Sequence, residues 1–86
     1  MNCPKIVGWT YNLGMDKQML ERHLAQADEH VAIGRKNIAQ QRQIIAELER
    51  GGHDTKQAIA TLDNFEELQA MHLADWDRIR RELAKD

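Results

Sequence analysis

The chain has 86 residues, of which 30% are charged and 5% are aromatic, and its formal net charge is -2 at pH 7. A domain of this size buries only a small core, and a composition rich in charge and poor in aromatic residues favours long solvated helices over a β-sandwich or a β-barrel. The slightly acidic balance gives no general attraction to nucleic acid or anionic lipid, and a single cysteine excludes an internal disulfide framework.

Residues 1–15 differ in composition from the rest of the chain. They contain its only proline, Pro4, together with Trp9 and Tyr11, and they show no helical period. We predict an irregular or disordered tail, with an anchoring role for the two aromatic residues and a true start at Met15 as open alternatives. The segment lacks the basic start and apolar stretch of a signal peptide. Nothing in the chain approaches the ~20 apolar residues of a membrane span, so we expect a cytoplasmic protein with no membrane contact.

The first predicted helix covers residues 16–50. It begins at Asp16, whose carboxylate can accept hydrogen bonds from the exposed amides of the first turn. Arg50 complements the carbonyl end of the helix dipole, and Gly51 is expected to take the left-handed conformation that closes a helix. At ~1.5 Å per residue the helix is about 52 Å long, which is in the range of coiled coils.

Residues 51–53, Gly-Gly-His, form the predicted turn, and the second predicted helix covers residues 54–84. Asp54 is its expected N-cap, and Gln57 three positions later completes a variant of the capping box. Residues 16–86 are therefore predicted to form one helical domain after the tail.

Both helices carry an apolar seam with the alternating steps of three and four residues that are typical of coiled coils. In the first helix the seam consists of Leu20, Leu24, Ala27, Val31, Gly34, Ile38, Gln41, Ile45 and Leu48. In the second helix it consists of Thr55, Ala58, Leu62, Phe65, Gln69, His72, Trp76, Ile79 and Leu83. A chain that folds back at the glycines pairs Leu48 with Thr55 and Leu20 with Leu83, with every seam residue between them matched in order. The pattern predicts an all-α fold, an antiparallel two-helix hairpin of the coiled-coil type.

Side-chain size supports this register, because Trp76 faces Ala27 and Gln69 faces Gly34. Glycine inside a helix costs about 1 kcal/mol relative to alanine, so close approach of the facing side chain is the expected reason for Gly34. The seam also contains three polar residues: Gln41, Gln69 and His72. These residues either fix the register or lie half exposed at the rim of the seam.

Charged residues beside the seam form opposite-sign pairs between the predicted helices. The pairs are Glu21 with Arg80, Arg35 with Glu66, His23 with Glu82 and His30 with Asp75. Each exposed pair is worth about 0.2–1 kcal/mol, so the pairs select orientation and register more than they stabilise the fold.

Apolar residues outside the seam predict a partner. One set falls on one side of the hairpin and is the expected interface: Met19, Ile33, Ile44, Leu68 and Met71. A second set falls toward the other side: Ala25, Ala32, Ala39, Ala46, Ile59, Ala70 and Leu73. Two isolated helices cannot cover both sets, so we expect a second hairpin, from another copy or a different protein, to complete a four-helix bundle. A two-fold symmetric homodimer is the common solution.

The residue types needed for catalysis are scarce. The chain has no serine, and Cys3 has no histidine near it in sequence, so the sequence offers no activated nucleophile for covalent catalysis. Gly51 and Gly52 lack the lysine and following hydroxyl of a phosphate-binding loop. We expect no enzymatic activity and no cofactor.

Metal binding and nucleic-acid binding are the chemical alternatives. The candidate metal ligands, which could come from facing helices as in bundle metal sites, are His23, His30, His72, Asp75 and Glu82. His23 and His30 are two turns or about 10 Å apart, too far for one ion, so we predict surface histidine–carboxylate pairs and no metal site. The basic residues near the C-terminal end are interleaved with acidic ones, so nucleic acid is not the expected partner. These basic residues are Arg78, Arg80, Arg81 and Lys85.

Four sequence blocks between Leu20 and Leu83 resemble sequences in a known group of proteins. They are Glu-Arg-His-Leu-Ala-Gln-Ala, Ile-Ala-Gln-Gln-Arg-Gln-Ile-Ile-Ala-Glu-Leu-Glu, Gly-His-Asp-Thr at the turn and Phe-Glu-Glu-Leu-Gln-Ala-Met-His-Leu. With these blocks the chain resembles small helical-hairpin proteins of soil α-proteobacteria such as rhizobia, a group with no established function. The resemblance implies a bacterial cytoplasmic origin and a start near Met15, but no activity.

Taken together, these patterns predict a non-enzymatic protein–protein interaction or structural module. It is expected to form a homodimer, with another protein as the other candidate partner. The alternative function is a small regulator that binds a metal ion or nucleic acid.

Overall fold

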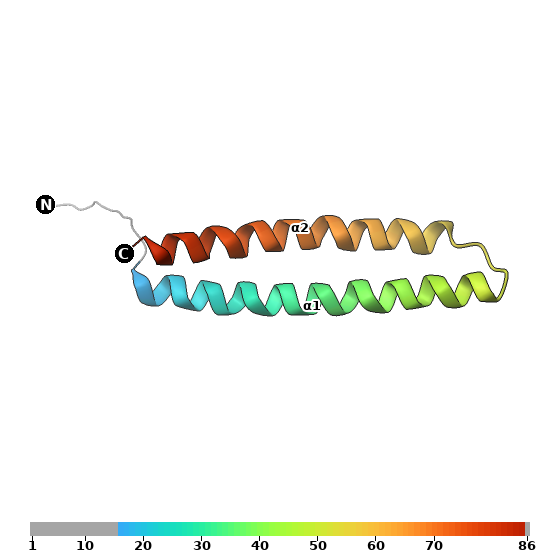
Figure 1. Cartoon of the computed structure of the whole chain (residues 1–86), viewed down its shortest axis with the longest axis horizontal. Helices are drawn as coiled ribbons and strands as arrows, with labels where there is room; N and C mark the ends of the chain where they lie inside the picture. Colours follow the sequence, from blue (N-terminus) through green and yellow to red (C-terminus); the bar gives the residue numbers. More distant parts are fainter. Residues whose placement is uncertain (1–15, 86) are drawn as a thin grey trace, which may run out of the picture.

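Residues 16–85 are described by the computed structural model, which contains two α-helices and, within that range, no strand. Helix α1 spans Lys17–Arg50 and helix α2 spans Lys56–Ala84. The helices pack side by side and are joined by a turn at one end, while the start of α1 and the end of α2 lie at the other end (Figure 1). The predicted all-α fold is confirmed. The predicted tail, residues 1–15, lies outside the described residues.

Helix α1 begins with the predicted cap. Asp16 has extended backbone geometry, and its carboxylate oxygen accepts a hydrogen bond from the amide of Met19 at 2.8 Å. The bond satisfies one of the amides that the first helical turn leaves without a partner inside the helix. Neither α1 nor α2 contains a segment that is long and apolar enough to span a membrane.

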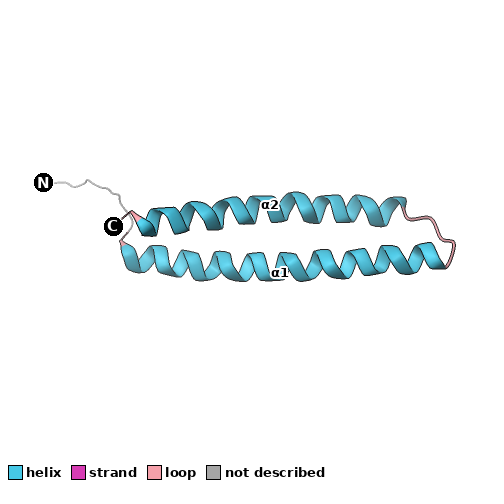
Figure 2. Ribbon diagram, viewed as in Figure 1, coloured by secondary structure: helices cyan, strands magenta, loops and turns pink. Residues whose placement is uncertain are grey.

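A loop joins the end of α1 to the start of α2 (Figure 2). A Schellman motif closes α1 at this turn. The amide of Gly52 donates to the carbonyl oxygen of Glu49 at 3.1 Å, and the amide of His53 donates to that of Leu48 at 2.9 Å. Gly52 has a φ of 73°, in the left-handed region, whereas Gly51 has a φ of -85°. The prediction that Gly51 takes the left-handed conformation is therefore wrong by one residue, because helical geometry continues through Gly51.

Helix α2 begins at Lys56, two residues later than the predicted start at residue 54. Thr55 is the N-cap residue and makes no side-chain capping bond. The carboxylate of Asp54 accepts from the amide of Lys56 at 3.1 Å, which is the spacing of an Asx turn. The predicted capping box of Asp54 and Gln57 is wrong, since Asp54 organises the turn that precedes the helix.

All residues of the predicted seam are buried or half-buried. Four of them are buried: Ala27, Val31, Gln69 and Ile79. Within residues 16–85, only Ala46 and Thr61 are shielded from solvent without belonging to the predicted seam. No side chain in the described range is completely buried, so the core between the two helices is thin.

Two glutamine side chains connect the helices across the seam. The amide nitrogen of Gln41 on α1 donates to the carbonyl oxygen of Ala58 on α2 at 2.9 Å. The amide nitrogen of Gln69 on α2 donates to the carbonyl oxygen of Val31 on α1 at 3.0 Å. Gln69 is only 8% exposed, so a half-exposed rim position, one of the two interpretations of the polar seam residues, is wrong for it.

Trp76 packs on the seam at the end of the helix pair that lies away from the turn. Its indole nitrogen donates to the carboxylate of Asp28 on α1, the residue that follows the buried Ala27. The guanidinium of Arg80 lies over the indole ring, 4.6 Å from its centre. These contacts involve Asp28 and Arg80, so the pairing of Trp76 with Ala27 stays a prediction.

Candidate functional site

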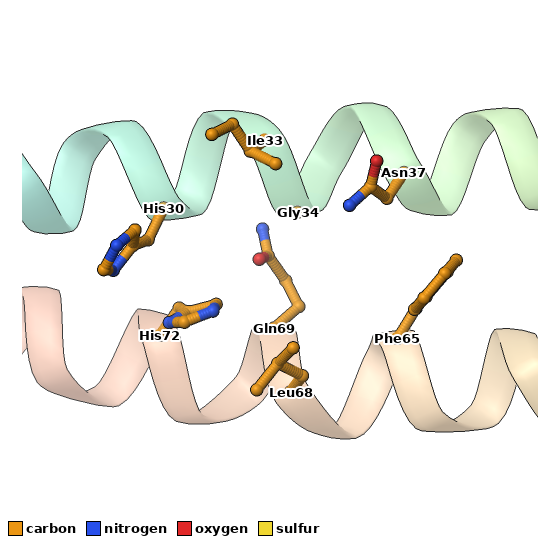
Figure 3. Close-up of a pocket in the computed structure, with 8 residues that line it drawn as sticks. All are labelled: His30, Ile33, Gly34, Asn37, Phe65, Leu68, Gln69 and His72. Carbon is orange, nitrogen blue, oxygen red and sulfur yellow. The ribbon is translucent and has the colours of Figure 1, made fainter.

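A groove lies at the middle of the helix pair, between α1 and α2 (Figure 3). We call it the central groove, and its volume is about 110 Å³. It is lined by four residues from each helix: His30, Ile33, Gly34, Asn37, Phe65, Leu68, Gln69 and His72. Both polar and apolar side chains therefore line one small hollow.

Gly34 and Gln69 form one wall of the central groove. A Cβ atom added to Gly34 would lie 1.8 Å from the side-chain oxygen Oε1 of Gln69, far inside van der Waals contact. The glycine therefore provides the space through which Gln69 reaches the carbonyl oxygen of Val31. This confirms close approach as the reason for Gly34. Oε1 of Gln69 is buried and has no hydrogen-bond partner within the described residues.

Two histidines meet at one end of the central groove. His30 projects from α1 and His72 from α2, and their ring centres are 5.0 Å apart with an angle of 42° between the ring planes (Figure 3). His30 is exposed, and His72 is half-buried as a seam residue.

Five large apolar side chains on the two helices are exposed, with exposed fractions from 39% to 64%. We call this set the apolar face, and it consists of the predicted interface residues Met19, Ile33, Ile44, Leu68 and Met71. Ile33 and Leu68 also line the central groove, so the groove opens onto this face. Two residues of the second predicted set, Ile59 and Leu73, are exposed as well.

The charged pairs between the helices differ from the predicted ones. Glu66 on α2 is bound by Arg42 at 2.8 Å and not by Arg35. Arg80 stacks on Trp76 and does not pair with Glu21. All of these groups lie at the surface, where several partners are within reach of a long side chain and each pair contributes little free energy.

The five candidate metal ligands are only partly brought together. His30 and His72 are in contact, and His23, His30 and Asp75 line one shallow hollow. The carboxylate of Asp75 accepts a hydrogen bond from Arg78 on the same helix. Glu82 pairs with Lys85 at 3.2 Å, also within α2, so the predicted pairs of these carboxylates with His30 and His23 do not form. Within residues 16–85 no group of three or more histidine, cysteine, aspartate or glutamate side chains is placed to hold a metal ion.

The basic residues near the end of α2 are engaged by neighbouring groups. Arg78 and Lys85 bind Asp75 and Glu82, and Arg81 lies 3.4 Å from the carboxylate of Asp77. The fourth, Arg80, covers the indole of Trp76. Acidic partners thus offset most of the positive charge that a phosphate backbone would need.

Sequence reasoning missed the central groove and the contact of Arg80 with Trp76. The contact of Arg80 with Trp76 could have been predicted from the sequence, because residues four apart on a helix are neighbours and arginine pairs well with an indole ring. The groove depends on how Phe65 and Asn37 are turned, which no periodic pattern specifies.

Comparison of the chain with protein-family models, with curated proteins and with solved structures gave no match. The resemblance to small helical proteins of soil α-proteobacteria therefore stays a prediction.

Proposed function

We propose that the chain is a non-enzymatic protein-interaction module, an antiparallel helical hairpin that pairs with a second copy of itself to form a four-helix bundle. The observation that carries the proposal is the apolar face, whose five large side chains are exposed on a single helix pair. Monomeric proteins rarely leave such a set uncovered, because each side chain gains about 1.5–3 kcal/mol on full burial.

The distribution of the apolar face along the helices favours a second copy as the partner. Ile33 is at the middle of α1, and Leu68 and Met71 flank the middle of α2. A two-fold axis through the middle of the face would set these three residues against the same three of the other copy. It would also bring Met19 of one copy to within about one helical turn of Ile44 of the other. The face is therefore self-complementary, as an isologous interface requires.

The thin core supports the same proposal. The seam alone leaves no side chain of residues 16–85 completely buried. Packing a second helix pair on the apolar face would bury Ile33 and Leu68, as in four-helix bundles. The scarcity of nucleophiles, including the absence of serine from the sequence, is why the proposed role is non-enzymatic.

Sedimentation equilibrium tests the proposal. We expect the unmodified protein to be a dimer and Met71→Glu to raise the dimer dissociation constant by about 30-fold or more, since the charge would be buried without a partner in each copy. Ala60→Glu is the matched control, because Ala60 is exposed on α2 and belongs to neither the seam nor the apolar face. A strictly monomeric protein, or equal effects of the two substitutions, would contradict the proposal.

A further inference from the structure

The ring centres of His30 and His72 are at the separation expected for two ligands of one metal ion. Imidazole nitrogens bind zinc at about 2.0–2.1 Å, so two rings that hold one tetrahedral ion have their centres about 5 Å apart. The ring centres here are 5.0 Å apart, and the rings approach each other from different helices (Figure 3). The spacing of the two rings is thus compatible with one ion bound between them.

The neighbouring groups leave this pair available. Asp75 was the predicted partner of His30, but its carboxylate accepts a hydrogen bond from Arg78. The amide nitrogen of Gln69, which also lines the central groove, donates to the backbone of α1. His30 is exposed, so an ion can reach the pair from solvent and complete its coordination with water.

We propose that His30 and His72 form a binding site for a divalent transition-metal ion of the type that imidazole prefers, such as Zn²⁺ or Ni²⁺. The site lies within one chain and joins α1 to α2. It differs from the pair considered from sequence, His23 and His30, which lie on one helix. Because both ligands are in place only when the helices are packed, the bound ion stabilises the folded helix pair over the unfolded chain.

Thermal unfolding with and without metal tests the site. Untagged protein is stripped with a chelator, and its helix content is followed by circular dichroism in the absence and presence of Zn²⁺ or Ni²⁺. At a metal concentration about ten times the dissociation constant, we expect the Tm of the unmodified protein to rise by about 6 °C. His30→Ala and His72→Gln should each remove the rise.

The chain supplies its own controls, since it has four histidines. His23 and His53 are exposed, and His53 lies in the turn. His23→Ala and His53→Ala should keep the full rise in Tm. The proposal is overturned if the unmodified protein shows no rise, if the full rise persists in either His30→Ala or His72→Gln, or if either control removes it.

A second measurement covers the case in which His72→Gln disturbs the seam. In NMR spectra of the unmodified protein, the ring protons of His30 and His72 should shift or broaden together as Zn²⁺ is added, while those of His53 should not change. Selective response of His53, or no response of any histidine, would overturn the site. Sedimentation of the metal-free protein tests the dimer separately, so the two proposals can fail independently.

Discussion

The contact between Gly34 and Gln69 shows how a polar side chain is accommodated in a thin core. The amide of Gln69 gains a hydrogen bond to Val31, but its oxygen stays buried without a partner among the described residues. The net contribution of one such bond is about 0.5–1.5 kcal/mol, and the glycine that makes room for it costs about 1 kcal/mol of helix propensity. The pair therefore contributes little net stability and acts mainly on how the helices align.

The effect of Gly34→Ala on the free energy of unfolding should change sign with the residue at position 69. In the unmodified protein, Gly34→Ala should destabilise by about 1 kcal/mol, because the new methyl group displaces Gln69 and leaves its amide unsatisfied. In a Gln69→Ala background the same substitution should stabilise by about 1 kcal/mol, the difference in helix propensity. Urea unfolding of the four proteins measures this double-mutant cycle. Stabilisation in both backgrounds would show that Gln69 does not occupy the space above Gly34.

At some helix ends the sequence pattern determines which residue begins or ends the helix, and at others two neighbouring residues are equally suited. Asp16 is a cap that no neighbouring residue can replace, and the structure has it as predicted. At the turn, two adjacent glycines can each adopt the left-handed conformation, and Asp54 and Thr55 can each precede α2. The choice among them depends on how the helices meet, which a local pattern does not contain.

The two glycines of the turn should respond differently to alanine. Gly52 has a φ of 73°, so Gly52→Ala should destabilise by about 1 kcal/mol. Gly51→Ala should be nearly neutral, because Gly51 has helical geometry and the added Cβ would lie 2.8 Å from the side chain of His53, which is exposed and free to move aside. Thermal or urea unfolding of both variants measures the difference. Equal effects would place the left-handed residue elsewhere.

Packing between the helices makes a further prediction at the scale of elements. Ala27 is 4% exposed and is the predicted partner of Trp76, so Ala27→Trp should overpack the seam and destabilise by about 1–3 kcal/mol. Ala32→Trp is the control, since Ala32 is on the same helix but exposed. The two variants share the change in helix propensity, so their difference in unfolding free energy reports the seam contact. No difference between them would mean that Ala27 does not face a filled position.

At the scale of the whole molecule, the heptad pattern predicted which residues lie between the helices, because burial along a coiled coil follows directly from the spacing of apolar residues. Ala46 and Thr61 are the exceptions among the described residues. The surface pairs of Glu66 and Arg80 were predicted incorrectly, since exposed charges choose among partners of nearly equal energy. Of the candidate sites, the apolar face was read from sequence, whereas the central groove was not.

The proposed dimer predicts that stability depends on protein concentration. Because association is linked to folding by mass action, the Tm of the unmodified protein should rise with protein concentration, and that of Met71→Glu should not. Circular dichroism melts over a dilution series measure this. A Tm that is independent of concentration for the unmodified protein would indicate a helix pair that is stable alone.

The fluorescence of Trp76 reports on the part of the helix pair that lies away from the turn. Its indole is bonded to Asp28 on the other helix and covered by Arg80, so its emission senses whether α1 and α2 are in contact there. Replacing Trp9 by phenylalanine leaves Trp76 as the one indole in the chain. Its emission then reports the separation of the helix ends, while the far-ultraviolet signal reports helix content over the whole length. Fraying that starts at the helix ends away from the turn is thereby distinguishable from unfolding that starts at the turn.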